Sequence, residues 1–135
     1  MPPVRSETIP VRNSEDVLRV RQIVRNWAVA AKFSLVDQTK LVTAASEIAR
    51  NTVIYGGGGE LTLDALEDRG RHGVRLCFRD RGPGIDDVER ALRDGYTTGG
   101  GLGLGLGGAR RLVNDFAIES RTGAGTTVRL TRWKT

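Results

Sequence analysis

The feature that most constrains this chain is a glycine-rich stretch over residues 80–108, DRGPGIDDVERALRDGYTTGGGLGLGLGG. It holds ten of the 18 glycines and lies between an apolar strand pattern and an amphipathic helix pattern. Glycine loses more conformational freedom on folding than any other residue, so a cluster of this size is destabilising unless something offsets the loss. We therefore expect the stretch to bind a ligand, with a phosphate-bearing molecule as the candidate.

Length and composition predict one domain over residues 1–135. A chain of 135 residues can bury a core without disulfide or metal staples. The single cysteine, Cys77, is typical of a reducing compartment. The sequence contains neither an apolar run of membrane-spanning length nor the apolar segment of a signal peptide. We expect a cytoplasmic protein with no membrane partner.

The chain is basic, with a net charge of +5, and 18 of its 21 basic residues are arginine. Such a charge is compatible with an anionic partner: a nucleic acid, a nucleotide or an acidic protein face. The arginines are spread along the chain in runs no longer than two, and few aromatic residues accompany them to stack on bases. A solvated basic surface is therefore favoured over a nucleic-acid site.

Hydrophobic periodicity predicts an alternation of helices and strands. The predicted helices cover residues 14–33, 37–55 and 104–116, and the predicted strands cover 60–66, 73–80, 117–121 and 126–133. The polar run EDRGRH over 67–72 is predicted as a turn, which would leave His72 exposed.

Three polar side chains lie beside the predicted core. Glu47 and Asn51 are four residues apart at the border of a helical apolar stripe, where such a pair is often only a surface pair. Asp80 ends a strand and shares a face with its apolar residues, so it must find hydrogen-bond donors. It either caps the DRGPG turn or receives the amine of a ligand. Thr126, in the last predicted strand, points to the same face.

Two common phosphate-binding motifs are absent. A dinucleotide-binding loop needs a strand running directly into the glycines, but Asp80 ends the strand well before Gly101. No GxxxxGK[ST] sequence occurs either. These two kinds of site are therefore set aside, and the glycine run alone could also form only a flexible loop.

Four short motifs follow one another along the chain. They are Glu47-x-x-x-Asn51, Asp80-x-Gly82-x-Gly84, Gly101-x-Gly103-x-Gly105 and Gly125-Thr126. Their order and spacing resemble the ATP-binding fold of the GHKL superfamily, which includes gyrase, histidine kinases and MutL. Within it, SEIARNTVIY…DRGPGI…DGYTTGGGLGLGLGGARRLVNDF resembles the small serine/threonine kinases of the RsbT and RsbW anti-sigma group, above all the RsbT-type switch kinases. The resemblance implies an α+β fold of Bergerat type: a two-layer sandwich whose mixed, mostly antiparallel sheet carries three helices on one face.

The resemblance also implies a role for each motif. Asp80 would accept the exocyclic amine of adenine with help from Thr126, Glu47 would be the general base, and Asn51 would bind Mg²⁺. The glycines and a lid over about 86–105 would contact the rest of the ATP. The further nucleotide-binding residues are Gly82, Gly84, Thr98, Gly99, Gly101, Gly103 and Gly105.

The implied function is an ATP-dependent serine/threonine protein kinase of a bacterial partner-switching, stressosome-like module. Its substrates would be STAS-domain antagonist or scaffold proteins, and it would then activate a downstream PP2C-type phosphatase. The alternative is an RsbW-like anti-sigma factor that sequesters a sigma factor. A histidine kinase acting in trans is disfavoured, because the only histidine, His72, is not in a helix pair of the dimerisation type.

Overall fold

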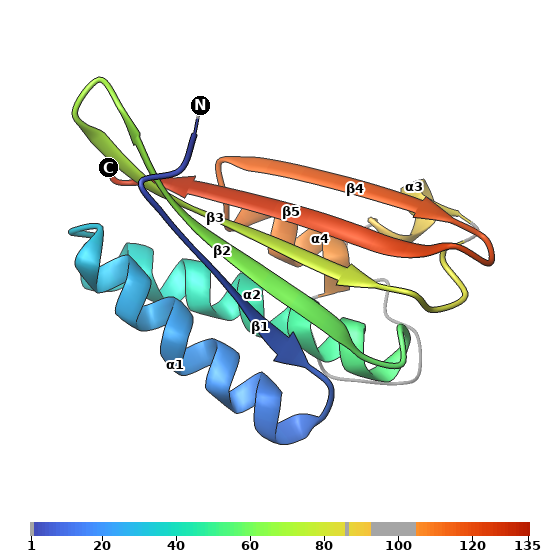
Figure 1. The fold of residues 1–135 in the computed structure, drawn as a ribbon. Coiled ribbons are helices and arrows are strands. Elements are labelled where there is room, and N and C mark those ends of the chain that lie inside the picture. The colour runs from blue at the N-terminus through green and yellow to red at the C-terminus, as the bar shows by residue number, and fades with distance from the viewer. Residues whose placement is uncertain (1, 86, 93–104) are drawn as a thin grey trace.

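The chain folds into a sheet with helices packed on one face, and the computed structural model describes residues 2–85, 87–92 and 105–135. The elements are β1 (Arg5–Val11), α1 (Ser14–Ala30), α2 (Leu35–Ile54), β2 (Gly59–Asp68), β3 (Arg71–Asp80), α3 (Val88–Ala91), α4 (Gly105–Arg111), β4 (Asp115–Arg121) and β5 (Gly125–Trp133). The strand order is β1-β2-β3-β5-β4, and each neighbouring pair is antiparallel. Helices α1, α2 and α4 lie on the same side of this sheet (Figure 1).

This architecture confirms the predicted α+β sandwich with three helices on one face. The sheet differs in one respect, since the sequence predicted a mixed sheet and the described strands form only antiparallel pairs. The alternation of apolar residues places the core between the two layers. In β3, for example, Val74, Leu76 and Phe78 face the helices and are almost fully buried. None of the described helices is long and apolar enough to cross a membrane.

The hairpin between β2 and β3 corrects the prediction for His72. The polar run over 67–72 is mostly strand, and only Arg69 and Gly70 form the turn, with φ of 54° and 80°. Positive φ at both central residues is the geometry that suits a two-residue hairpin. Both strands therefore extend further than their apolar residues do. His72 lies in β3 opposite Glu67 and is half-buried.

The third long helix is also shorter than predicted. The sequence indicated a helix over 104–116, whereas α4 ends at Arg111 and β4 begins at Asp115. Phe116 pairs with Leu130 across β4 and β5, so it faces the core from a strand. Helical and strand periodicity both place Phe116 on an inner face, which is why the pattern did not separate them.

A buried ion pair joins the start of α2 to the last strand. Arg132 Nη2 lies 2.6 Å from Asp37 Oδ1, and the two side chains are 10% and 7% exposed. Arg132 also donates to the Leu112 carbonyl just beyond α4, and the Thr135 hydroxyl donates to Asp37 Oδ2. The hydrogen bonds from Thr135 and Arg132 lower the pKa of Asp37, against the opposing effect of burial. This network holds α2, α4 and β5 together.

Replacing Arg132 by methionine should lower the free energy of unfolding by about 3 kcal/mol at neutral pH, because it leaves a buried carboxylate unpaired. The pKa of Asp37 is lowered in the folded protein, so its carboxylate stabilises the fold above the unfolded pKa of about 4. That contribution is lost as pH falls through the pKa of Asp37 in the folded protein. The difference in free energy of unfolding between the wild type and Arg132→Met should therefore become smaller over that pH range. Urea unfolding at several pH values measures both effects.

The control is Arg79→Met. Arg79 lies 4.0 Å from Glu60, with both side chains about half exposed. Such a pair contributes less than about 1 kcal/mol. Equal losses for Arg79→Met and Arg132→Met would contradict the role given to the buried pair.

Candidate functional site

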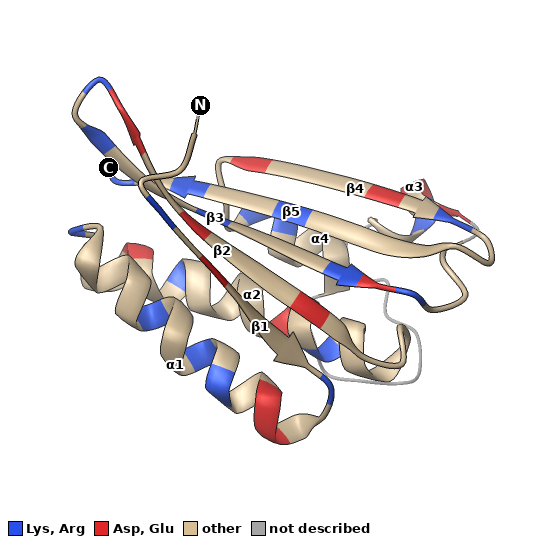
Figure 2. Ribbon diagram, viewed as in Figure 1, with Lys and Arg blue, Asp and Glu red and all other residues tan. Residues whose placement is uncertain are grey.

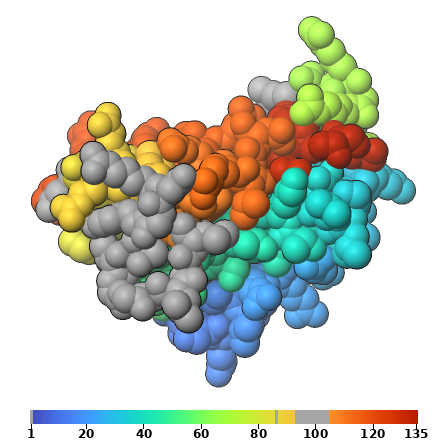
Figure 3. Space-filling view, turned by 180° about the vertical axis from the view of Figure 1, so that it is seen from behind, coloured from blue at the N-terminus to red at the C-terminus, as the bar shows by residue number. Residues whose placement is uncertain are grey.

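The predicted site residues that the structure describes lie toward one end of the sheet. The end of α2, the end of β3 and the beginning of β5 lie at this end of the molecule (Figure 1). Seen from behind, the segment of α4 lies against α2 (Figure 3). The antiparallel register explains the convergence, because β3 ends next to the point where β5 begins.

Asp80 joins three segments of this end through its carboxylate. Its Oδ1 accepts hydrogen bonds from the backbone N–H of Gly82 at 2.9 Å and from that of Thr126 at 3.2 Å. The predicted turn cap is therefore present. Oδ2 accepts no hydrogen bond from the described residues, so it has capacity for a further donor. The two roles considered for Asp80 are thus compatible, one on each oxygen.

Glycines let the backbone pack against this carboxylate. A Cβ on Gly56, just after α2, would overlap the carboxyl group of Asp80, and one on Gly82 would lie 2.7 Å from Gly56 Cα. Gly84 has φ of 80°, and a Cβ there would overlap the carbonyl of Arg121. The sequence singled out Gly82 and Gly84. It missed Gly56, the residue directly after the helix predicted over 37–55.

Thr126 is held by a residue that the sequence analysis did not consider. Its hydroxyl lies 2.8 Å from that of Ser120 on β4, directly across the hairpin. Ser120 Oγ also accepts the backbone N–H of Ile85 at 2.7 Å. Ser120 therefore ties the loop after β3 to the strand pair that carries Thr126. The signal was available, since Ser120 shares its inward face with Ile118 and Phe116.

Glu47 is buried and bound on both oxygens. It is 8% exposed, Oε1 accepts the backbone N–H of Gly105 at 3.0 Å, and Oε2 accepts Arg50 Nη2 at 2.7 Å. Gly105 begins α4 with φ of 70°. The structure thus joins two predicted residues that lie 58 positions apart in the sequence. A carboxylate at the start of a helix is favoured by the helix dipole.

Asn51 lies one turn beyond Glu47 and is half-buried. Its side chain makes no hydrogen bond to the described part of the chain, which leaves the amide oxygen available. Within those residues there is also no cluster of three or more histidine, cysteine or acidic side chains that could hold a metal. An amide oxygen together with phosphate oxygens and water suits Mg²⁺, which is seldom held by a full set of protein ligands. The residues therefore fit the predicted ion.

Four predicted residues, Thr98, Gly99, Gly101 and Gly103, lie outside the described residues. The same holds for most of the lid predicted over 86–105. Within its described part, α3 is capped by Asp87, whose side chain accepts the backbone N–H of Arg90 at 3.0 Å.

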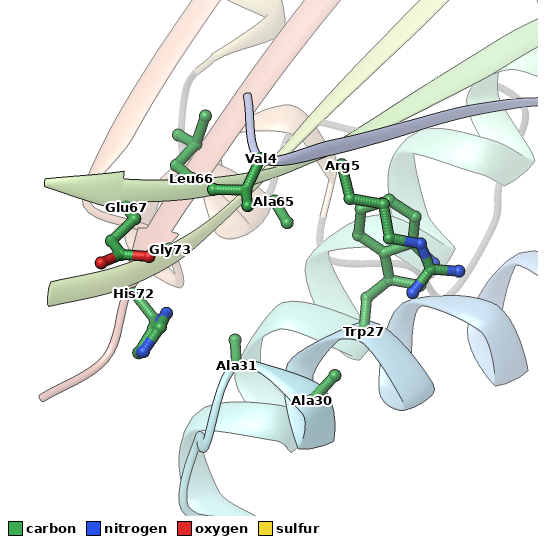
Figure 4. A pocket seen from close by; sticks show the side chains of 10 residues that line it. All are labelled: Val4, Arg5, Trp27, Ala30, Ala31, Ala65, Leu66, Glu67, His72 and Gly73. Atoms are coloured by element: carbon green, nitrogen blue, oxygen red, sulfur yellow. The ribbon is translucent and has the colours of Figure 1, made fainter. Parts of the chain in front are cut away.

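A hollow of about 150 Å³ lies between the end of α1 and the β2–β3 hairpin (Figure 4). Trp27 and Ala30 line it from α1, Ala31 lines it just after that helix, and His72 and Glu67 lie at the hairpin side. It contains none of the predicted site residues. The nucleotide chemistry predicted from the sequence concerns residues outside this hollow.

Charges of both signs are interspersed over the fold. Basic and acidic residues are both distributed over several strands and helices in the view of Figure 2. Many of the arginines are paired, as in Arg75–Asp64 at 3.0 Å and Arg19–Asp16 at 3.1 Å. This distribution supports the prediction of a solvated surface.

Comparison with known proteins identifies the family. Residues 11–132 match the family described as histidine kinase-like ATPase domain. The chain belongs to this family. Membership implies a nucleotide site, and the GHKL resemblance is confirmed.

Curated relatives of this ATPase domain include a serine/threonine-protein kinase and anti-sigma F factors. The chain is 41% identical over 118 residues to the serine/threonine-protein kinase RsbT of Bacillus subtilis, covering 87% of this chain and 89% of the relative. It is 35% identical over 104 residues to the anti-sigma F factor of Bacillus licheniformis, covering 71% and 69%.

Solved structures show the same ATPase-domain fold. The RsbU and RsbW domains of a Mycobacterium tuberculosis protein match with a TM-score of 0.67 and 24% identity, over 98% of this chain and 34% of that one. The mycobacterial sensor histidine kinase MprB matches with a TM-score of 0.55 and 17% identity, over 96% and 97%. At these identities the likeness concerns the fold alone.

Substituting Gly56 by alanine should weaken ATP binding by at least about tenfold, because the new Cβ displaces the Asp80 carboxylate and costs a hydrogen bond. Gly57→Ala is the control, since its Cβ would meet nothing within 4 Å although φ is 72°. It reports backbone strain alone. Calorimetric titration with ATP compares the two, and equal affinities would contradict the contact assigned to Gly56.

Proposed function

We propose that this protein is an ATP-dependent serine/threonine protein kinase of a bacterial partner-switching module. The observation that carries the proposal is the 41% identity to a serine/threonine-protein kinase over about nine-tenths of both chains. The geometry supports it. A buried carboxylate, Glu47, and an available amide, Asn51, lie on one helix beside the start of α4.

The proposed roles follow from the chemistry of each group. Asp80 selects adenine by accepting its exocyclic amine on Oδ2, while Oδ1 keeps the loop and β5 in place. Thr126, held by Ser120, assists at the base. Asn51 holds Mg²⁺, which neutralises charge on the phosphates when bound. The amide of Gly105, which donates to Glu47 in the structure, would donate to the phosphates when ATP is bound, and the GHKL resemblance gives Gly101 and Gly103 the same role.

Glu47 acts as the general base. The hydroxyl oxygen of a substrate serine or threonine forms a bond to the γ-phosphorus of ATP. The bond between the γ-phosphorus and the oxygen that bridges it to the β-phosphorus breaks, and ADP leaves. Glu47 takes the hydroxyl proton, so charge and atoms balance. Positioning and charge stabilisation account for most of phosphoryl-transfer catalysis, and the residues named above provide both.

The proposed substrates are STAS-domain antagonist or scaffold proteins, and the proposed later partner is a PP2C-type phosphatase. Because ATP is the phosphate donor, we place the reaction in the cytoplasm. The second candidate is an RsbW-like anti-sigma factor, favoured by the 35% identity to an anti-sigma F factor. Co-purification with a sigma factor would favour this candidate, and co-purification with a phosphatase would favour the first.

Asp80→Asn tests the nucleotide site. Asparagine keeps one oxygen to accept the N–H groups of Gly82 and Thr126. Its amide NH₂ is a donor, however, in the place where the exocyclic amine of adenine needs an acceptor. We expect the unfolding midpoint to change little and ATP affinity to fall on the order of 10- to 100-fold, the cost of an unpaired polar group. Asp80→Ala, which also removes the turn cap, should lose stability as well. Unchanged ATP binding by Asp80→Asn would rule out the adenine contact.

Glu47→Gln tests the chemistry. Incubation of the protein with labelled ATP, Mg²⁺ and a STAS-domain protein should label the latter. The variant should transfer phosphate at least about 100-fold more slowly, the usual contribution of a general base, while still binding ATP. If the wild-type protein binds ATP but labels no STAS-domain protein, the anti-sigma function is favoured instead. Phosphate transfer by Glu47→Gln at the wild-type rate would exclude Glu47 as the general base.

A further inference from the structure

Arg50 forms an ion pair with the proposed base. It lies one turn beyond Glu47 on α2, and its Nη2 is 2.7 Å from Glu47 Oε2. We infer that Arg50 is a positioning residue for phosphoryl transfer, which acts by fixing the carboxylate of Glu47. The inference rests on the proposed function and adds a residue to it.

The pair differs from an ordinary surface ion pair on a helix. Exposed pairs at this spacing contribute little, because water screens both charges. Here the glutamate side chain is only 9% exposed, although that of Arg50 is 44% exposed. A buried carboxylate depends on its hydrogen-bond donors, and Arg50 is the cationic one among the described residues.

Two elements hold the two oxygens of this carboxylate. Gly105 N–H at the start of α4 binds Oε1, and Arg50 on α2 binds Oε2. With a single bond, the carboxyl group of a glutamate can still rotate about its terminal torsion, which is broad. Both bonds together fix the plane of the carboxylate, and the bond from Arg50 is the one that stays on α2 to restrain it when the amide of Gly105 donates to phosphate. A general base must meet its proton within hydrogen-bond reach, so this orientation matters for catalysis.

Removal of Arg50 should therefore impair the chemical step and spare nucleotide binding. In Arg50→Met we expect kcat to fall by at least about tenfold, the scale of a small misplacement of a catalytic group. The Kd for ATP should stay within about twofold of the wild-type value, because Arg50 acts on the chemical step and not on the binding of ATP. Arg50→Lys, which keeps a cationic donor, should recover part of the loss.

The matched control is Arg19→Met. Arg19 also forms an ion pair with an acid three residues away on a helix, at 3.1 Å to Asp16, and its side chain is 54% exposed. It lies on α1, apart from the candidate site. The kcat of the Arg19→Met variant should equal that of the wild type. Should Arg50→Met fail to fold, Arg50→Gln provides the same comparison with a good helix-forming residue.

A double-mutant cycle with Glu47→Gln separates positioning from other roles. If Arg50 acts through Glu47, Arg50→Met should cause no further loss of single-turnover rate in the Glu47→Gln protein. An equal loss in both backgrounds, or a parallel rise in the Kd for ATP, would mean that Arg50 contacts the nucleotide and would overturn the inference. So would wild-type kcat in Arg50→Met. If the wild-type protein transfers no phosphate at all, the proposed kinase function fails. That result is distinct from a failure of the inference about Arg50, which requires wild-type transfer.

Discussion

The candidate site depends on the close contact between Gly56 and the Asp80 carboxylate. Gly56 follows α2 and Asp80 ends β3. This contact therefore sets the distance between the helical layer and the sheet at the end that holds the candidate site. Side chains between the layers would normally keep them apart. The missing side chains of Gly56 and Gly82 let the two backbones meet, while Asp80 Oδ1 satisfies N–H groups of the loop and of β5.

Helix α4 shows how strongly this end relies on tertiary contacts. Three of its seven residues are glycine, each of which disfavours a helix by about 1 kcal/mol relative to alanine. The carboxylate of Glu47 binds its first amide, and the guanidinium of Arg132 binds the Leu112 carbonyl just past its end. Opposite charges at the two ends complement the helix dipole. The neighbouring elements therefore supply the stability that the sequence of α4 lacks.

Patterns within a segment predicted much of this fold, and contacts between segments explain the rest. Periodicity predicted α1, α2 and the four later strands, and spaced motifs singled out Glu47, Asn51, Asp80 and Thr126 as candidates. The sequence could not show which glycine of the run after α2 meets Asp80, nor that Arg50 points to Glu47. Both depend on how segments pack. The error at His72 has a similar origin, because polar residues continue the hairpin strands beyond the core.

The two bonds of Glu47 also bear on what nucleotide binding must change. The amide of Gly105 now donates to a carboxylate, whereas in the proposed kinase it faces phosphate, and one N–H cannot serve both anions well. Bound nucleotide would therefore compete with Glu47 for that amide. Arg50 remains on the other oxygen and retains the carboxylate on the α2 side when the first bond is lost. On this argument the base becomes available to a hydroxyl only when phosphate occupies the start of α4.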